Sequence, residues 1–298
     1  VVFTLSGLND TMGNRFVFFS LTALYYPFIV FCNVTILYAV MMHKKLHEPM
    51  FFFICNLCVN ALYGTVGFYP KFLYDLLSQD HVITYAGCLI QIFIIYSSVL
   101  CDISTLTVMA YDRYVAICRP LEYHSIMTDQ RIVECILFCW LTPFFCMTVL
   151  IGLTARLTLC GSAIEKLYCE NWSVVKLSCF STTVNNVVGL IVNIIGLYVL
   201  ATTVIIPLSL IIYSYVKILI ICRRSSPQFK KKSFQTCVPH IVVLLNFSVS
   251  VISEITLSRV VNLNISVGLS VFISLEFLLI PPILNPLVYG LSLSDIRK

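Results

Sequence analysis

Two oppositely charged residues stand side by side at the end of a long apolar run, within the segment 109–118. The run begins near Gly87, and Asp102 is its only charged residue before Asp112 and Arg113. Burying charge in lipid is costly, so such residues tend to face protein or water and to serve function. The pair could form a switch in which the acid holds the arginine. It could also simply mark where a membrane helix meets head-group water.

The composition is that of a membrane protein. The 298 residues are 59% hydrophobic and 11% charged, whereas soluble domains carry roughly 25% charged residues. No linker or internal repeat divides the chain, so we expect a single membrane domain, 1–298. The net charge is +5, but no nucleic-acid motif accompanies it. The first fifteen residues are polar and mixed, so no cleavable signal peptide is expected among them, and we expect the first membrane helix to act as the targeting signal.

Seven apolar segments are long enough to cross a bilayer, which takes about 20 residues per helix. They cover about 16–42, 50–76, 86–118, 131–153, 187–221, 233–258 and 266–290. With the N-terminus outside, the Lys and Arg residues of the outer segments are Arg15, Lys71, Arg156, Lys166, Lys176 and Arg259, and the others of the 19 lie inside. Inner loops carry the excess of basic residues. The sequence therefore predicts an all-α seven-helix bundle, with the N-terminus outside and the C-terminus inside.

The outer loop 154–186 is too long for a plain connector, and we expect it to fold over the mouth of the bundle as a lid. It holds Cys160, Cys169 and Cys179, while Cys88 opens the third helix. The outer side is oxidising, so disulfides are expected, but four cysteines allow three pairings. No His or CxxC accompanies them, so no metal site is expected. The sequon at Asn9, on what we expect to be a free outer tail, is a glycosylation candidate.

Five motifs occur in order and on the expected helices. They are Leu46-His-Glu-Pro-Met50, the segment MAYDRYVAICRPLEYHSIMT at 109–128, Ser214-Tyr215, Lys232-Ser-Phe-Gln-Thr-Cys237 with His240, and Pro282-Ile-Leu-Asn-Pro-Leu-Val-Tyr289. Through these motifs nearly the whole chain resembles the olfactory (odorant) receptors of the rhodopsin-like, class A, G-protein-coupled receptors. It looks most like their fish-type branch.

The resemblance implies a receptor that binds a small odorant outside and activates a heterotrimeric G protein of the olfactory, stimulatory type inside, raising cyclic AMP. In that family, Arg113 leaves Asp112 and meets the inserted G protein, and two tyrosines move in to support it. The implied switch residues are Asp112, Arg113, Tyr114, Tyr215, Asn285, Pro286 and Tyr289. The expected location is the plasma membrane of an olfactory sensory neuron.

The resemblance also implies two disulfides, Cys88–Cys169 and Cys160–Cys179, and it assigns an acid to the position of Asp102. Asp102 lies eleven residues before Arg113, about three helical turns, so both should point into the bundle. The family class usually has a second acid on the second helix, where this chain has Ala61. We therefore expect Asp102 to bind a sodium ion or a proton, or to be a hydrogen-bonded structural acid. No other cofactor is expected.

The family binds its ligand between the outer halves of the third, fifth, sixth and seventh helices. The matching positions here are Ile95, Tyr96, Val99, Leu100, Leu200, Thr203, Val204, Phe247, Ser250, Val251, Glu254, Leu275 and Leu278. An apolar lining with a few polar groups is usual for small-molecule pockets. For each aliphatic residue, ordinary helix packing is the competing interpretation.

Two acids, Glu254 and Glu276, lie in the outer parts of apolar helices. If ionised, either could pair with an ammonium group on a ligand. Arg259 could instead neutralise Glu254. We hypothesise a cationic ligand at Glu254, and the facing of Glu276 is left open.

Two other function classes are compatible with a multi-helix membrane protein. A rhodopsin-like receptor for an internal ligand is disfavoured by the motifs at 46–50 and 232–240. A secondary transporter could use Asp102, Glu254 and Glu276 as a proton relay, but transporters tend to show internal repeats, and none is found here. An enzyme is not expected, because no catalytic triad, zinc spacing or phosphate-binding loop appears.

Overall fold

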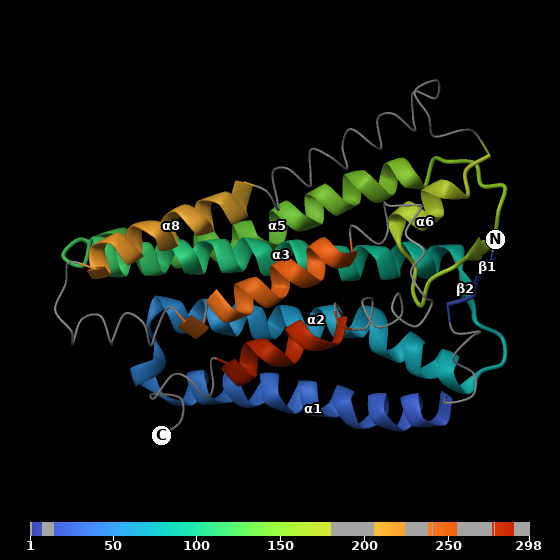
Figure 1. The fold of residues 1–298 in the computed structure, drawn as a ribbon, viewed down its shortest axis with the longest axis horizontal. Helices are drawn as coiled ribbons and strands as arrows, with labels where there is room; N and C mark the ends of the chain where they lie inside the picture. Colours follow the sequence, from blue (N-terminus) through green and yellow to red (C-terminus); the bar gives the residue numbers. More distant parts are fainter. Residues whose placement is uncertain are drawn as a thin grey trace.

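The computed structural model is a bundle of long helices with a small sheet and a folded lid at one end (Figure 1). The structure describes residues 2–7, 15–179, 206–223, 238–239, 241–254, 276 and 278–288. The N-terminus lies at the lid end, beside β1, β2 and α6.

Four helices within the described residues are long and apolar enough to cross a membrane. They are α1 (Arg15–Met42), α2 (Pro49–Leu77), α3 (Tyr85–Cys118) and α5 (Asp129–Thr154). Each begins and ends within about two residues of its predicted bounds. Pro49 opens α2, where a proline is well tolerated. The side chains of Thr84 and Thr128 cap α3 and α5 by accepting from the backbone N–H of Gly87 and Arg131.

The described parts of the later spans are also helical. They are α8 (Ile206–Arg223), Ile241–Glu254 and Leu278–Val288, which fall within the predicted fifth, sixth and seventh spans apart from the last two residues of α8. The rest of those three spans lies outside the described residues. Short helical turns follow α1 (η2, Lys44–Leu46) and α3 (α4, Tyr123–Ile126).

Helix α3 lies at the centre of the bundle and contacts α2, α5 and α8 (Figure 1). A buried polar chain ties three of these helices together. The amide of Asn56 donates to Thr105 at 2.8 Å and accepts from the indole N–H of Trp140 at 2.7 Å. Hydrogen bonds between membrane helices contribute about 1 kcal/mol each, so this chain fixes the register of α2, α3 and α5.

Large apolar side chains cover the outer faces of α1 and α5. Leu24 and Phe31 on α1, and Leu141 and Phe145 on α5, are each at least three-fifths exposed. Soluble proteins rarely expose such continuous apolar surface. These faces are therefore the lipid-contacting surface of a multi-pass membrane protein.

A three-stranded sheet at the outer end departs from the all-helical prediction. Strand β1 (Val2–Leu5) pairs antiparallel with β2 (Val82–Thr84) and parallel with β3 (Ala163–Ile164) of the lid. Alternation along β1 buries Phe3 and Leu5, as expected for a strand with one covered face. The start of the chain is thus part of the lid, and the expectation of a free outer tail is wrong for residues 2–7.

Gly7 lies tightly against the backbone of the lid. A Cβ added at Gly7 would lie 2.6 Å from the carbonyl carbon of Lys166, so the lid backbone must move. We expect Gly7→Ala to destabilise the folded receptor by about 1–3 kcal/mol, measured as a lower temperature of thermal inactivation in detergent. Gly152→Ala is the matched control, because nothing lies within 4 Å of that Cβ. Equal thermal stability of the two variants would contradict the close packing of residues 2–7 on the lid.

Candidate ligand site and inner switch

Two disulfides shape the lid. Cys88 at the outer start of α3 is bonded to Cys169, and Cys160 is bonded to Cys179. These are the two pairs that the resemblance implied. The first joins the lid to the central helix, and the second closes a loop that contains β3 and α6 (Asn171–Lys176). The lid is therefore a folded element held over the bundle.

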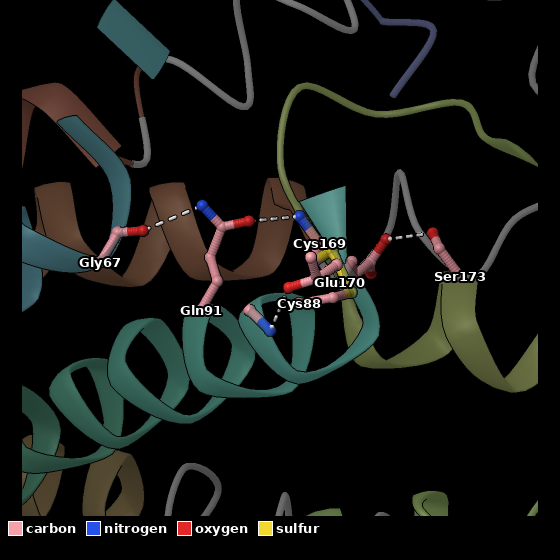
Figure 2. The surroundings of a disulfide bond; sticks show 8 residues. Gly67, Cys88, Gln91, Cys169, Glu170 and Ser173 are labelled. Atoms are coloured by element: carbon pink, nitrogen blue, oxygen red, sulfur yellow. Dashed lines mark hydrogen bonds between the residues drawn. A yellow bond between two sulfur atoms is a disulfide. The ribbon is translucent and has the colours of Figure 1, made fainter. Parts of the chain in front are cut away.

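Gln91 reinforces the first disulfide (Figure 2). Its amide donates to the carbonyl of Gly67 on α2 and accepts from the backbone N–H of Cys169, both at 2.9 Å. Gln91 lies one turn after Cys88 on the same face of α3. One buried side chain thus joins α2, α3 and the lid at a single point.

The lid also reaches the helix 241–254. The ammonium of Lys166 lies 3.1 Å from a carboxylate oxygen of Glu254, and the hydroxyl of Tyr168 donates to the same oxygen at 2.8 Å. The sequence had suggested Arg259 as the neutralising cation. Arg259 lies outside the described residues, whereas Lys166 supplies a cation from the lid, 88 positions away along the chain.

Below the lid, the described residues enclose a cavity of about 40 Å³. This volume holds a few water molecules. Four of its lining residues are predicted pocket positions, namely Ile95, Val99, Phe247 and Leu278, and the others are Ala61, Gly64, Thr65, Phe68, Tyr69, Ser98, Asp102, Pro281 and Pro282. Ile95, Val99 and Asp102 line it together because their spacing places them on one helix face.

Other predicted pocket residues lie elsewhere. Leu100 belongs to a separate apolar cluster with Met147 of α5, because one step along a helix turns a side chain about 100° from Val99. Tyr96 borders both apolar clusters, and Val251 is buried in the main core. The hydroxyl of Ser250 donates to Glu276 at 2.7 Å. Leu200, Thr203, Val204 and Leu275 lie outside the described residues, as does Asn9.

Glu276 faces the helix 241–254. Besides the bond from Ser250, its carboxylate accepts from the amide of Asn246 at 3.3 Å. Both partners are neutral donors, so these contacts fix the carboxylate without neutralising it. Glu276 thus holds the last two described membrane segments together, and Glu254 is the acid that faces the lid.

Asp102 lines the cavity beside Ala61. One of its carboxylate oxygens is buried without a hydrogen-bond partner among the described residues. Buried polar atoms are nearly always paired, by protein, water or an ion. Thr65 and Ser98 bring hydroxyls to the same cavity, whereas the side chain of Ala61 offers no oxygen. These oxygen atoms could coordinate a small hydrated cation or hydrogen-bond to a water molecule, and the carboxylate could instead carry a proton.

At the opposite end of α3, Asp112 is fully buried. Its carboxylate accepts from the Nε of Arg113 at 2.8 Å, is ion-paired with the same guanidinium, and accepts from the hydroxyl of Tyr123 at 2.7 Å. Burial, and then the Asp112 carboxylate, raise the pKa of the Tyr123 phenol, so the hydroxyl stays a donor. The pair is thus enclosed within protein, which a mere marker of the membrane boundary does not require.

The structure describes most of the other predicted switch residues. Tyr215 on α8 and Asn285 and Pro286 on 278–288 are buried, and Tyr114 is half-buried. Tyr289 lies outside the described residues. Buried positions on neighbouring helices suit groups that meet only when helices shift.

Five residues at these two sites were missed by reasoning from the sequence: Gln91, Lys166, Tyr168, Glu170 and Tyr123. Gln91 carried a usable signal, because it is a polar residue in an apolar helix one turn from a cysteine. Tyr123 lies inside the motif at 109–128, and Tyr168 and Glu170 flank Cys169, but the sequence did not show which groups these side chains contact. It also gave no sign that Lys166 reaches Glu254.

A bundle of apolar helices with a disulfide-tied lid at one end and a buried Asp–Arg pair at the other defines a rhodopsin-like receptor. A family model described as olfactory receptor matches residues 21–298. Similar proteins include olfactory receptor 6N1 of Homo sapiens, 34% identical over 99% of this chain and 92% of the relative. Olfactory receptor 1D2 of Pongo pygmaeus is 32% identical, over 99% and 91%. The chain belongs to the olfactory receptor family.

The protein is therefore an odorant receptor that binds a small ligand and signals through a heterotrimeric G protein, and it is not an enzyme. The internal-ligand receptor and the transporter are not favoured. The assignment to the fish-type branch stays a prediction.

Proposed function

We propose that this receptor recognises odorants that carry a cationic group, and that Glu254 contacts that group. The observation that supports the proposal is the contact with Lys166. A buried carboxylate, 5% exposed at the residue level, already holds an ammonium nitrogen at 3.1 Å. The same geometry suits an alkylammonium ligand, because both cations present N–H donors to one oxygen. The apolar residues Ile95, Val99, Phe247 and Leu278 would contact the hydrocarbon part, for which the cavity of about 40 Å³ must widen.

The test is a dose–response panel on wild type and Glu254→Gln. The probes are octylamine, octanoic acid and 1-octanol, which share a chain length and differ in charge. We expect Glu254→Gln to weaken the octylamine response at least tenfold, because a charge-assisted hydrogen bond contributes roughly 1.5–3 kcal/mol. The response to 1-octanol should change little. Glu276→Gln is the matched control, since that carboxylate accepts from neutral groups. An unchanged octylamine response in Glu254→Gln would remove the proposal.

We also propose the inner mechanism that the resemblance implied. Arg113 leaves Asp112 on activation and contacts the G protein, with Tyr114, Tyr215, Asn285, Pro286 and Tyr289 as the other members of the switch. The G protein is of the olfactory, stimulatory type, and the receptor acts in the plasma membrane of olfactory sensory neurons. The support for this switch is the enclosure of Asp112 by Arg113 and Tyr123.

A sodium ion or a proton at Asp102 is the remaining part of the proposal. Its support is that Asp102 lines the cavity and that one of its buried carboxylate oxygens has no hydrogen-bond partner in the part of the chain that the structure describes. Asp102, Thr65 and Ser98 would hold the cation through oxygen atoms, and the positive charge would offset that of the carboxylate. Because Ala61 brings no second carboxylate, the site suits a single positive charge. Asn9 remains the proposed glycosylation site.

A further inference from the structure

Lys166 lies between two carboxylates at the contact between the lid and the helix 241–254. Its ammonium is 3.1 Å from Glu254 and 3.8 Å from Glu170. The side chains of Lys166, Glu254 and Glu170 are 13%, 7% and 4% exposed. At such burial the two attractions are only weakly screened by solvent. Lys166 thus has two charged partners, Glu254 on the helix 241–254 and Glu170 within the lid.

The lid can hold Lys166 without help from the helix 241–254. Glu170 is four residues after Lys166 in the same segment, and it also accepts from the hydroxyl of Ser173 at 3.1 Å. Figure 2 shows Glu170 beside the Cys88–Cys169 disulfide, at the point where the lid joins α3. Glu170 is therefore held in place by the fold. Lys166 needs only a small side-chain rotation to pair with it fully.

Tyr168 connects this contact to the cavity. Its hydroxyl donates to the same oxygen of Glu254 that Lys166 contacts. Burial, and then the Glu254 carboxylate, hold the pKa of the phenol well above its usual range, so the hydroxyl stays a donor. The Tyr168 ring packs edge-on against Phe68, at 6.1 Å between centroids, and Phe68 lines the cavity. Tyr168 thus contacts both Glu254 and a residue that lines the cavity.

We infer that Lys166 is a built-in competitor for Glu254, which an ammonium group of the odorant displaces onto Glu170. The inference rests on the proposed contact between Glu254 and a cationic odorant, and it deepens that contact into a mechanism. One cation replaces another at Glu254, and the displaced ammonium moves to a carboxylate already beside it. No carboxylate of the cluster is left without a cation, and two ammonium groups then face two carboxylates.

The exchange breaks the ion pair between the lid and the helix 241–254, while the hydrogen bond from Tyr168 to Glu254 remains. The Lys166–Glu254 contact joins the lid, which the disulfide fixes to α3, to a helix that carries part of the proposed pocket. A neutral odorant of the same size has no charge with which to displace Lys166. The contact therefore selects for cationic odorants and couples their binding to loss of the ion pair between the lid and this helix.

The test compares Lys166→Gln with Lys176→Gln in the full-length receptor. Lys176 is a lid lysine that lies over the ring of Trp172, 5.7 Å from its centroid, so its substitution controls for loss of charge from the lid. The probes are octylamine and 1-octanol, and the readout is cyclic AMP normalised to surface expression. If Lys166 occupies Glu254 in about nine molecules of ten, its removal lowers the octylamine EC50 about tenfold. The 1-octanol response and the Lys176→Gln receptor should be unchanged.

The outcomes separate this inference from the proposal beneath it. If Glu254→Gln loses the octylamine response while Lys166→Gln does not lower the EC50, only the competitor is overturned. If octylamine acts equally on wild type and Glu254→Gln, the proposal of a cationic odorant at Glu254 is overturned, and with it the role of Lys166 as a competitor. The same holds if octylamine activates neither wild type nor Lys166→Gln. The double exchange Lys166→Glu with Glu254→Lys guards against misfolding of the single variant. It rebuilds the ion pair in reverse, and we expect surface expression to return while octylamine stays inactive. A full octylamine response in that receptor would overturn the inference.

Discussion

Replacing Asp112 by asparagine is expected to raise the ligand-independent cyclic AMP signal of this receptor about tenfold. The carboxylate is fully buried and holds the Arg113 guanidinium, with Tyr123 as its second partner. Asparagine keeps the shape but removes the charge, so the arginine loses its ion-pair partner. Breaking a buried pair from one side costs about 3–5 kcal/mol. If about 1.4 kcal/mol of this is lost from the inactive state alone, the active fraction rises tenfold.

The matched control is Asp129→Asn, the same substitution at an exposed carboxylate at the start of α5. We expect its basal signal to equal that of wild type. Tyr123→Phe removes one hydrogen bond from Asp112, a loss of about 1 kcal/mol, and should raise the signal by a smaller factor. A basal signal in Asp112→Asn at or below the wild-type level, at equal surface expression, would show that the pair does not hold the inactive state.

Loss of the Cys88–Cys169 disulfide is expected to have the largest effect on folding. The bond closes a segment of 81 residues, against 19 for Cys160–Cys179. In the chain-entropy account, loops of these lengths correspond to about 4.5 and about 3 kcal/mol of stabilisation. The longer bond also holds Cys169 where its backbone N–H meets Gln91. We expect Cys169→Ala to abolish most surface expression and Cys160→Ala to reduce it less.

Surface labelling and flow cytometry measure this difference. Cys146→Ala is the control, because Cys146 is a half-buried free cysteine on α5. We expect surface expression to be lowest for Cys169→Ala, intermediate for Cys160→Ala and close to wild type for Cys146→Ala. If Cys160→Ala and Cys169→Ala express equally well, the lid does not depend on its attachment to α3.

Hydropathy alone placed the first four membrane helices closely, because a bilayer demands one continuous apolar stretch per span and nothing more specific. It missed β1, since a four-residue strand at the start of a chain carries only the alternation of Phe3 and Leu5. That alternation becomes a signal only when the partner strands β2 and β3 are known. Strand pairing is a long-range property, whereas membrane insertion is a local one.

The candidate site also has features that local sequence patterns explain and others that only the folded structure shows. The resemblance implied that Ile95 and Val99 line the pocket, and the structure places both on one cavity with Asp102, because the helical period puts the three on one face of α3. The same period also shows why Leu100 could not accompany Val99 there. The sequence suggests Arg259, five residues after Glu254, as the neutralising cation, whereas Lys166 reaches Glu254 from the lid. Which cation pairs with Glu254 therefore depends on where the Cys88–Cys169 disulfide fixes the lid.

The sequence by itself determined the class of molecule, its seven-helix membrane fold with its orientation, and its family, because hydrophobicity, basic residues and short motifs act locally and are read in order along the chain. Only the tertiary structure decided which groups meet. It encloses Asp112 with Tyr123, joins Gln91 to the lid, and sets Lys166 between Glu170 and Glu254. The physical reason is that a buried charge takes the partner that the packed helices and the disulfide bring within about 4 Å. Separation along the sequence does not indicate which charged groups lie that close in the folded protein.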